Sequence, residues 1–201
     1  MRGLLLLISY IFHPLFIPLG GSVAFFLINP LSLDNEQKLR YLFPIFVLTI
    51  IIPIIFFFIL KSLKLISSAF APEIEERKYP LALNIIIILL LVFKVLPEYQ
   101  ITELYYFFLG LLLLSLTLLV LLFAKIKASI HMAGMGGLLL FLIGLSIHFE
   151  INITIALSIF TLASGLVATS RLYTHAHSKP ELLIGFTLGV CSQLFLFKFW
   201  L

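Results

Sequence analysis

The residues best suited to chemistry lie at positions 170–181, where two long apolar runs are separated by Ser-Arg-Leu-Tyr-Thr-His-Ala-His-Ser-Lys-Pro-Glu. An arginine, two histidines and a carboxylate this close together can bind an anion, relay a proton or attack an electrophile. Pro180 is suited to the first position of a helix, which puts Glu181 in the first turn and His177 just before it. A carboxylate there can accept the N–H of one imidazole nitrogen and leave the lone pair of the other free. His177 is therefore a candidate nucleophile.

Two further segments, around Arg171 and around Ser129, can contribute to binding of the same anion. Arg171 carries a permanent planar charge that can hold two phosphate oxygens at once. Ser129 is a suitable N-cap for the apolar run that begins at Ile130, and His131 then lies in the first turn, where backbone N–H groups favour an anion. Taken singly, each residue is better explained without chemistry, as part of a solvated basic loop or as an interfacial histidine bonded to a carbonyl. Their joint use requires a fold that brings them together.

The composition indicates which elements must position these residues. Of the 201 residues, 62% are hydrophobic and 11% are charged, and the apolar residues form runs of about 20, long enough to cross a bilayer. The runs are continuous rather than alternating, which favours helices over a barrel. We therefore predict an all-α, polytopic transmembrane helical bundle of six to seven spans, in a single integral-membrane domain over residues 1–201. Cys191 has no partner for an intrachain disulfide.

Seven apolar runs are candidate spans: 3–28, 41–60, 80–96, 104–124, 130–149, 151–169 and 181–200. The loops after the second, fourth and sixth spans must lie on the same side of the membrane as the N-terminus. These loops contain the segments around Arg77, Ser129 and Arg171, so we predict that the chemistry lies on one face. Prolines at positions 14, 18, 44 and 53 fall within spans, where they predict kinks rather than breaks.

Several residues inside the spans can also be placed from the sequence. His13 is costly in lipid and should face the interior of the bundle, which makes it a further candidate for function. Asn84 and Gln193 are expected to form interhelical hydrogen bonds. Small residues at positions 133, 134, 136 and 137 predict a close approach between helices.

The pattern Ser170-Arg171, five residues, His177, three residues, Glu181 resembles the third signature of the type 2 phosphatidic acid phosphatase superfamily, S-R-x5-H-x3-D, with glutamate replacing aspartate. The segment Ser129-Ile130-His131 is similar to the second signature, P-S-G-H, with the serine and histidine retained.

The first signature, K-x6-R-P, is matched only in part by Arg77 and Pro80. Counting back from Arg77 or Lys78 gives Phe70 or Ala71, so the signature lysine is absent. The resemblance implies a phosphatase-like core over about residues 41–201, preceded by an extra N-terminal span, 3–28.

This resemblance implies hydrolysis of a lipid phosphate or diphosphate without a metal or other cofactor. His177 would attack phosphorus to give a phosphohistidine, Glu181 would orient it, and His131 would protonate the leaving alkoxide. Substrate binding would fall to Arg171, Ser129, Arg77 and Ser170, with Lys78 or Lys127 in place of the missing lysine.

The expected partners are a polyprenyl or glycerolipid phosphate and the membrane lipids. The net charge of +4 is spread along the loops and does not predict binding to nucleic acid. The bias of basic residues favours a site on the cytoplasmic face of the plasma (inner) membrane, although many members of the resembled family act on the outer or lumenal face.

Two other functions are alternatives to a phosphatase. A non-catalytic lipid-binding or transport protein on the same scaffold would explain the missing lysine. A phospho-alcohol transferase should carry an aspartate-rich motif, and Asp34 is the only aspartate in the sequence.

Overall fold

The computed structural model describes residues 2–30, 33–66, 75–96 and 100–201, and within these ranges it contains helices and no strand. In chain order the elements are α1 (Arg2–Ile11), η1 (Pro14–Phe16), α2 (Ile17–Ile28), α3 (Asn35–Phe46), η2 (Val47–Ile51), α4 (Ile52–Ser62), η3 (Glu75–Arg77), α5 (Lys78–Leu90), η4 (Leu91–Val95), α6 (Thr102–Phe123), α7 (Ile130–His148), α8 (Thr154–Tyr173), α9 (Lys179–Leu194) and α10 (Phe197–Trp200). The predicted helical bundle is confirmed.

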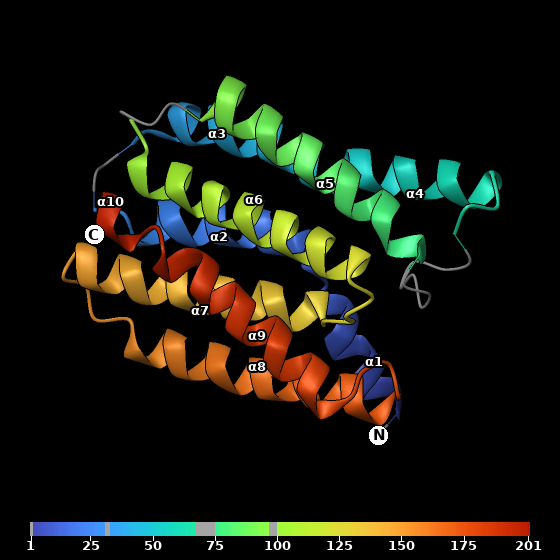
Figure 1. Ribbon diagram of the computed structural model, residues 1–201. Coiled ribbons are helices and arrows are strands. Elements are labelled where there is room, and N and C mark those ends of the chain that lie inside the picture. Colours follow the sequence, from blue (N-terminus) through green and yellow to red (C-terminus); the bar gives the residue numbers. More distant parts are fainter. Residues whose placement is uncertain (1, 31–32, 67–74, 97–99) are drawn as a thin grey trace.

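Seven helical stretches of the described chain are long and apolar enough to cross a bilayer, which makes this an integral membrane protein. They are Leu5–Ile28, Asn35–Ser62, Lys78–Val95, Thr102–Phe123, Ile130–His148, Thr154–Tyr173 and Lys179–Trp200. Figure 1 shows the two ends of the chain at opposite ends of the bundle, as an odd number of crossings requires. The second span begins earlier than predicted because Asp34 and Gln37 form a capping box at the start of α3.

The first span contains a break where the sequence predicted a kink. His13 precedes Pro14 and has an extended backbone (φ −65°, ψ 140°), as expected of a residue that the following proline ring excludes from the helical region. The chain therefore leaves α1 and re-enters helix as η1 and α2, and Figure 1 shows α1 running in a different direction from α2. Pro18 lies in the first turn of α2, where a missing N–H costs nothing.

The central helix of the bundle is α7, which packs against α2, α8 and α9. Its contact with α9 is made by the two backbones. A β-carbon at Gly189 would overlap the carbonyl oxygen of Ala133, and one at Gly185 would overlap that of Ser129. On the other side of the contact, Gly136 packs on the carbonyl of Phe186. The close approach predicted from the small residues of α7 is thus confirmed, and its partner is α9.

Gly189→Ala tests this contact. We expect the substitution to lower the free energy of unfolding by about 1–3 kcal/mol, because the added methyl group must push α7 and α9 apart. The matched control is Gly165→Ala on α8, where a β-carbon meets no atom within 4 Å. Thermal unfolding of the purified proteins in detergent compares the two. Equal stabilities would contradict the backbone contact.

Candidate active site

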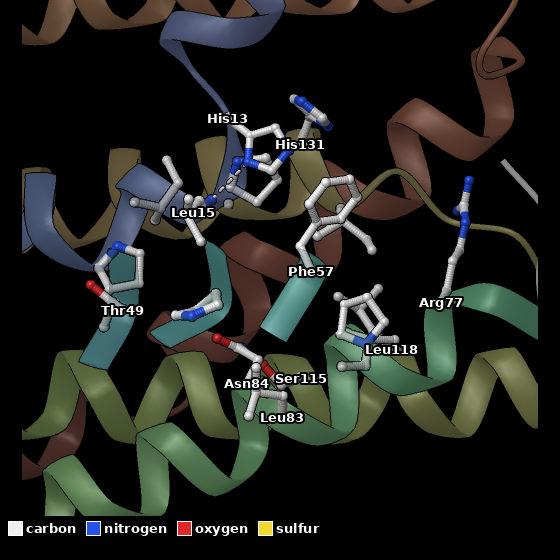
Figure 2. Close-up of a pocket in the computed structure, with 18 of the residues that line it drawn as sticks. His13, Leu15, Thr49, Phe57, Arg77, Leu83, Asn84, Ser115, Leu118 and His131 are labelled. Atoms are coloured by element: carbon white, nitrogen blue, oxygen red, sulfur yellow. Dashed lines mark hydrogen bonds between the residues drawn. The ribbon is translucent and has the colours of Figure 1, made fainter. Parts of the chain in front are cut away.

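A cavity of about 330 Å³ lies between η1 and α2 on one side and η2, α4, α5, α6 and α7 on the others. Most of its lining is apolar. It is lined by five ionisable side chains: His13 just before η1, Arg77 on η3, His131 on α7, Arg171 on α8 and His177 in the loop after α8. Figure 2 shows His13 and His131 close together and Arg77 at one end of the view. Four of the nine residues that the sequence singled out therefore meet in one cavity.

His177 and Glu181 form a hydrogen-bonded pair. The Nδ1 atom of His177 lies 2.6 Å from Oε2 of Glu181, four residues later in the first turn of α9. Burial lowers the pKa of His177 to about 4, against the opposing effect of the hydrogen bond to Glu181, and the charges of Arg77 and Arg171 lower it further. The imidazole is therefore neutral at pH 7. With Nδ1–H donated to the carboxylate, Nε2 carries the lone pair that a nucleophile needs.

His177 reaches this position because of how α8 ends. The helix continues through Ser170 and Arg171 to Tyr173, beyond the predicted end at Thr169. The left-handed residue His175 (φ 52°) then reverses the chain. The N–H of Ala176 donates to the carbonyl of Arg171 (3.1 Å), which is the Schellman pattern. The N–H of His177 also donates to that carbonyl (3.4 Å), so the histidine is held against the last turn that carries Arg171.

Substitutions of His175 test this backbone role. We expect His175→Gly to raise the free energy of unfolding by about 1 kcal/mol, because glycine adopts a positive φ without strain. His175→Val should lower the free energy of unfolding, because a β-branched residue is strained in this conformation. Thermal unfolding of the purified proteins measures both effects. A glycine variant less stable than the wild type would contradict the backbone role.

Two buried arginines make the cavity suited to an anion. Arg77 is 8% exposed and Arg171 is 6% exposed. Arg77 donates from Nη1 to the carbonyl of Ala128 (3.4 Å), which ties η3 to the residue before Ser129. Burial lowers the pKa of Arg77, but a guanidinium keeps its charge at any physiological pH. Because the described residues that line the cavity include no carboxylate, an entering anion meets two positive charges in a medium of low dielectric constant.

Ser129 and His131 occupy the predicted positions at the start of α7. Ser129 is the N-cap, its hydroxyl accepting from the N–H of Met132 (3.4 Å), and His131 lies in the first turn. The backbone N–H of Ser129 donates to the carbonyl of Glu181 (3.0 Å), which joins the start of α7 to the start of α9. The two catalytic segments suggested by the sequence are therefore fixed to each other by a backbone hydrogen bond.

His13 faces the interior of the bundle, as predicted, and lines the cavity beside His131, a neighbour that the sequence did not predict. Its ring lies 5.2 Å from that of His131, centroid to centroid, in an edge-to-face arrangement. The Nδ1 atom of His13 accepts a hydrogen bond from the backbone N–H of Leu15 (3.2 Å), so the neutral imidazole carries its proton on Nε2. The signal available in the sequence was a histidine directly before a proline within a span, where the chain breaks and a polar side chain can turn inward.

Four of the predicted binding residues lie outside the cavity lining: Ser170, Lys78, Lys127 and Ser129. The hydroxyl of Ser170 contacts α1, 2.6 Å from the carbonyl of Leu5 and 2.7 Å from Oγ of Ser9. Lys78 is exposed, with its ammonium over the ring of Tyr79. Lys127 lines a separate recess of about 20 Å³ beside Arg77.

The two positions at which the signature lysine would be expected, Phe70 and Ala71, lie outside the described residues. Ser129 is buried at the cap of α7 and is not part of the lining either.

Asn84 and Gln193 form the interhelical hydrogen bonds that were predicted for them. Asn84 on α5 donates to Oγ of Ser115 on α6 (2.8 Å). Gln193 on α9 donates to the carbonyl of Phe107 on α6 (3.1 Å).

Comparisons of the chain with protein families, with curated proteins and with solved structures find no match. What this protein does is therefore inferred from its own side chains and their arrangement. Among the described residues, no group of three or more histidine, cysteine, aspartate or glutamate side chains is placed to hold a metal ion.

Proposed function

We propose that this protein is a membrane phosphatase that hydrolyses a lipid phosphate or diphosphate through a phosphohistidine on His177, by the chemistry of the type 2 phosphatidic acid phosphatase superfamily. The observation that carries the proposal is the meeting of the His177–Glu181 pair with His131 and two buried arginines in an otherwise apolar cavity. Such a cavity suits a molecule with an anionic head and a hydrocarbon tail.

In the first step Nε2 of His177 attacks phosphorus while the bond from phosphorus to the leaving oxygen breaks. Glu181 stabilises the positive charge that develops on the imidazole, since it accepts from Nδ1. Arg77 and Arg171 stabilise the charge spread over the equatorial oxygens. His131 donates a proton to the leaving alkoxide, and the negative charge of the bound phosphate favours its protonated form.

In the second step water attacks the phosphohistidine and the bond between nitrogen and phosphorus breaks. His131, which lost its proton in the first step, accepts one from this water. Inorganic phosphate leaves, and the neutral His177 is restored. The cycle needs no metal and no other cofactor.

Two departures from the family signatures affect the catalytic pair and the side chains that would hold the phosphate, which we call the phosphate clamp. Glu181 is one methylene longer than the signature aspartate and still lies at hydrogen-bond distance from His177. In place of the missing lysine, the third donor is the Nε2–H of His13, whose ring lies beside that of His131. A neutral N–H gives less charge than a lysine, so we expect this clamp to depend heavily on its two arginines.

The experiment that tests the proposed function measures phosphate release from a panel of polyprenyl and glycerolipid phosphates by the purified wild-type protein in detergent or nanodiscs. Release from at least one lipid is expected. Binding of a lipid phosphate without release would instead favour the non-catalytic lipid-binding alternative. Neither binding nor release would reject both.

We place the site at the cytoplasmic face of the plasma (inner) membrane. With Arg77, Arg171 and Lys127 set aside, six basic residues lie on the side of the site and four on the other side. In a variant with Cys191 replaced by serine, we expect Ser62→Cys and His175→Cys to react with an impermeant maleimide only after the cells are permeabilised. Asn152→Cys, in the exposed turn before α8, should react on intact cells. The reverse pattern would place the site on the outer face.

A further inference from the structure

The apolar part of the cavity contains a hydroxyl group that forms no hydrogen bond with the described part of the protein. Thr49 on η2 is 3% exposed and lines the cavity, and its hydroxyl has no hydrogen-bond partner among the described residues. Figure 2 shows Thr49 at the opposite end of the view from Arg77, with Asn84 and Ser115 between them. A buried hydroxyl without a partner is unfavourable, so a residue of this kind in a binding cavity suggests that the ligand supplies the partner.

Several other hydroxyls of the described helices donate to their own backbone. Ser115, Thr161 and Thr169 each donate to the carbonyl four residues earlier on their own helix. Thr49 lies in the π-turn Val47–Ile51, which interrupts the α-helical ladder. The Thr49 hydroxyl, unpartnered among the described residues, therefore lies at a local irregularity on the cavity wall.

Asn84 presents a second hydrogen-bond donor to the same cavity. One N–H of its amide is donated to Ser115, whose own hydroxyl donates to the carbonyl of Leu111 (2.8 Å). An amide has a second N–H and a carbonyl oxygen, and Asn84 lines the cavity. Arg77 is the N-cap of α5, and Asn84 lies seven residues later on that helix. Asn84 is therefore about 10 Å deeper along the helix axis.

We propose that Thr49 and Asn84 form a binding subsite that donates hydrogen bonds to the ester oxygens of a glycerolipid phosphate. The inference rests on the proposed function in one respect, which is that the phosphate lies between Arg77, Arg171 and His177. In a glycerolipid phosphate the ester oxygens lie a few bonds beyond the phosphate, in the direction of the tail. A polyprenyl phosphate has only hydrocarbon there, and its binding would leave the Thr49 hydroxyl buried without a partner.

Thr49 and Asn84 line the same cavity of about 330 Å³ as Arg77, Arg171 and His177. A ligand whose phosphate lies at the two arginines therefore extends toward Thr49 and Asn84 within one cavity.

The first test uses the wild-type protein and three ligands: a diacylglycerol phosphate, the dialkyl ether analogue of equal chain length, and a polyprenyl monophosphate. The ester and ether lipids differ only in their carbonyl oxygens. We expect kcat/KM for the ester lipid to exceed that for the ether by about 10-fold, the usual effect of leaving a buried donor unpaired. Dissociation constants, measured on His177→Asn so that no turnover occurs, should show the same ratio. Equal values for the two lipids would overturn the proposal.

The second test uses Thr49→Val and Asn84→Leu. Thr49→Val should fold normally, because it removes a buried hydroxyl without a partner and keeps the shape of the side chain. In each variant we expect the ratio of kcat/KM for the ester lipid to that for the ether lipid to fall from about 10-fold to about threefold or less, because one of the two donors is lost. The matched control is Thr161→Val on the exposed side of α8, which should retain the full preference. An unchanged preference in the two variants would overturn the proposal.

These measurements distinguish the failure of the subsite from the failure of the proposed function. If no lipid phosphate is hydrolysed but the ester lipid still binds more tightly than the ether, and only while Thr49 is present, the subsite stands and the phosphatase does not. If phosphate is released at equal rates from the ester, ether and polyprenyl substrates, the phosphatase stands and the subsite does not.

Discussion

His177→Asn is expected to lower the rate of phosphate release from a lipid phosphate by about 10⁴- to 10⁶-fold, the range seen when the nucleophile of a covalent mechanism is removed. Asparagine is of similar size and can still hydrogen-bond Glu181, but its amide nitrogen has no lone pair available for attack. The variant leaves Arg77 and Arg171 in place. The dissociation constant of the lipid phosphate should therefore change by no more than about threefold, because a nucleophile acts in the transition state rather than in binding of the substrate.

The chain contains a matched control for this variant. His148, near the end of α7 opposite to His131, forms a second histidine–glutamate pair, with its Nε2 atom 3.0 Å from Oε1 of Glu103. The ion pair and ring contacts described for His148 include no arginine. His148→Asn should retain full activity after correction for folded protein. Equal losses in the two variants would assign the effect on activity to stability and would contradict a nucleophilic role for His177.

His131→Ala is expected to lower the rate by about 10²- to 10⁴-fold with a lipid phosphate, because an alkoxide is a poor leaving group and needs a proton in the transition state. With an aryl phosphate, whose leaving phenolate is stable without a proton, the loss should fall to about 10-fold or less. A merely structural role for His131 would lower the two rates equally. Steady-state rates with both substrates therefore test general-acid catalysis apart from folding.

The wild-type protein and His177→Asn complete this comparison. In His177→Asn both substrates should lose activity to the same extent, because attack on phosphorus is required whichever group leaves. If His131→Ala lowers the two rates equally, proton donation must be assigned to another residue, and His13, 5.2 Å away, is the next candidate to substitute.

The parts of the fold that follow from local sequence could be predicted. Long apolar runs define the seven spans whatever their neighbours, since any sequence of that length and polarity favours a bilayer-spanning helix. Ser129 and Pro180 act within a single turn, so the starts of α7 and α9, and with them the positions of His131 and Glu181, followed from the residues alone.

The parts that depend on distant contacts could not be predicted. Ser170 resembles a phosphate ligand in its signature, but its hydroxyl contacts α1, 161 and 165 residues away in the sequence, and no local pattern indicates that contact. The meeting of His13 with His131 requires both the break before Pro14 and the packing of α2 on α7. The end of α8 was placed too early, because His175 ends that helix in a left-handed conformation that sequence rules assign mainly to glycine.

The most direct test of the central claim is to identify the covalent intermediate. The purified protein is mixed with a lipid phosphate, quenched in alkali within the first turnovers, digested and examined by mass spectrometry. Phosphate carried on His177, and absent from the same peptide of His177→Asn, is the predicted result. Phosphate release without any phosphorylated histidine, or with phosphate on another residue, would contradict the proposed mechanism.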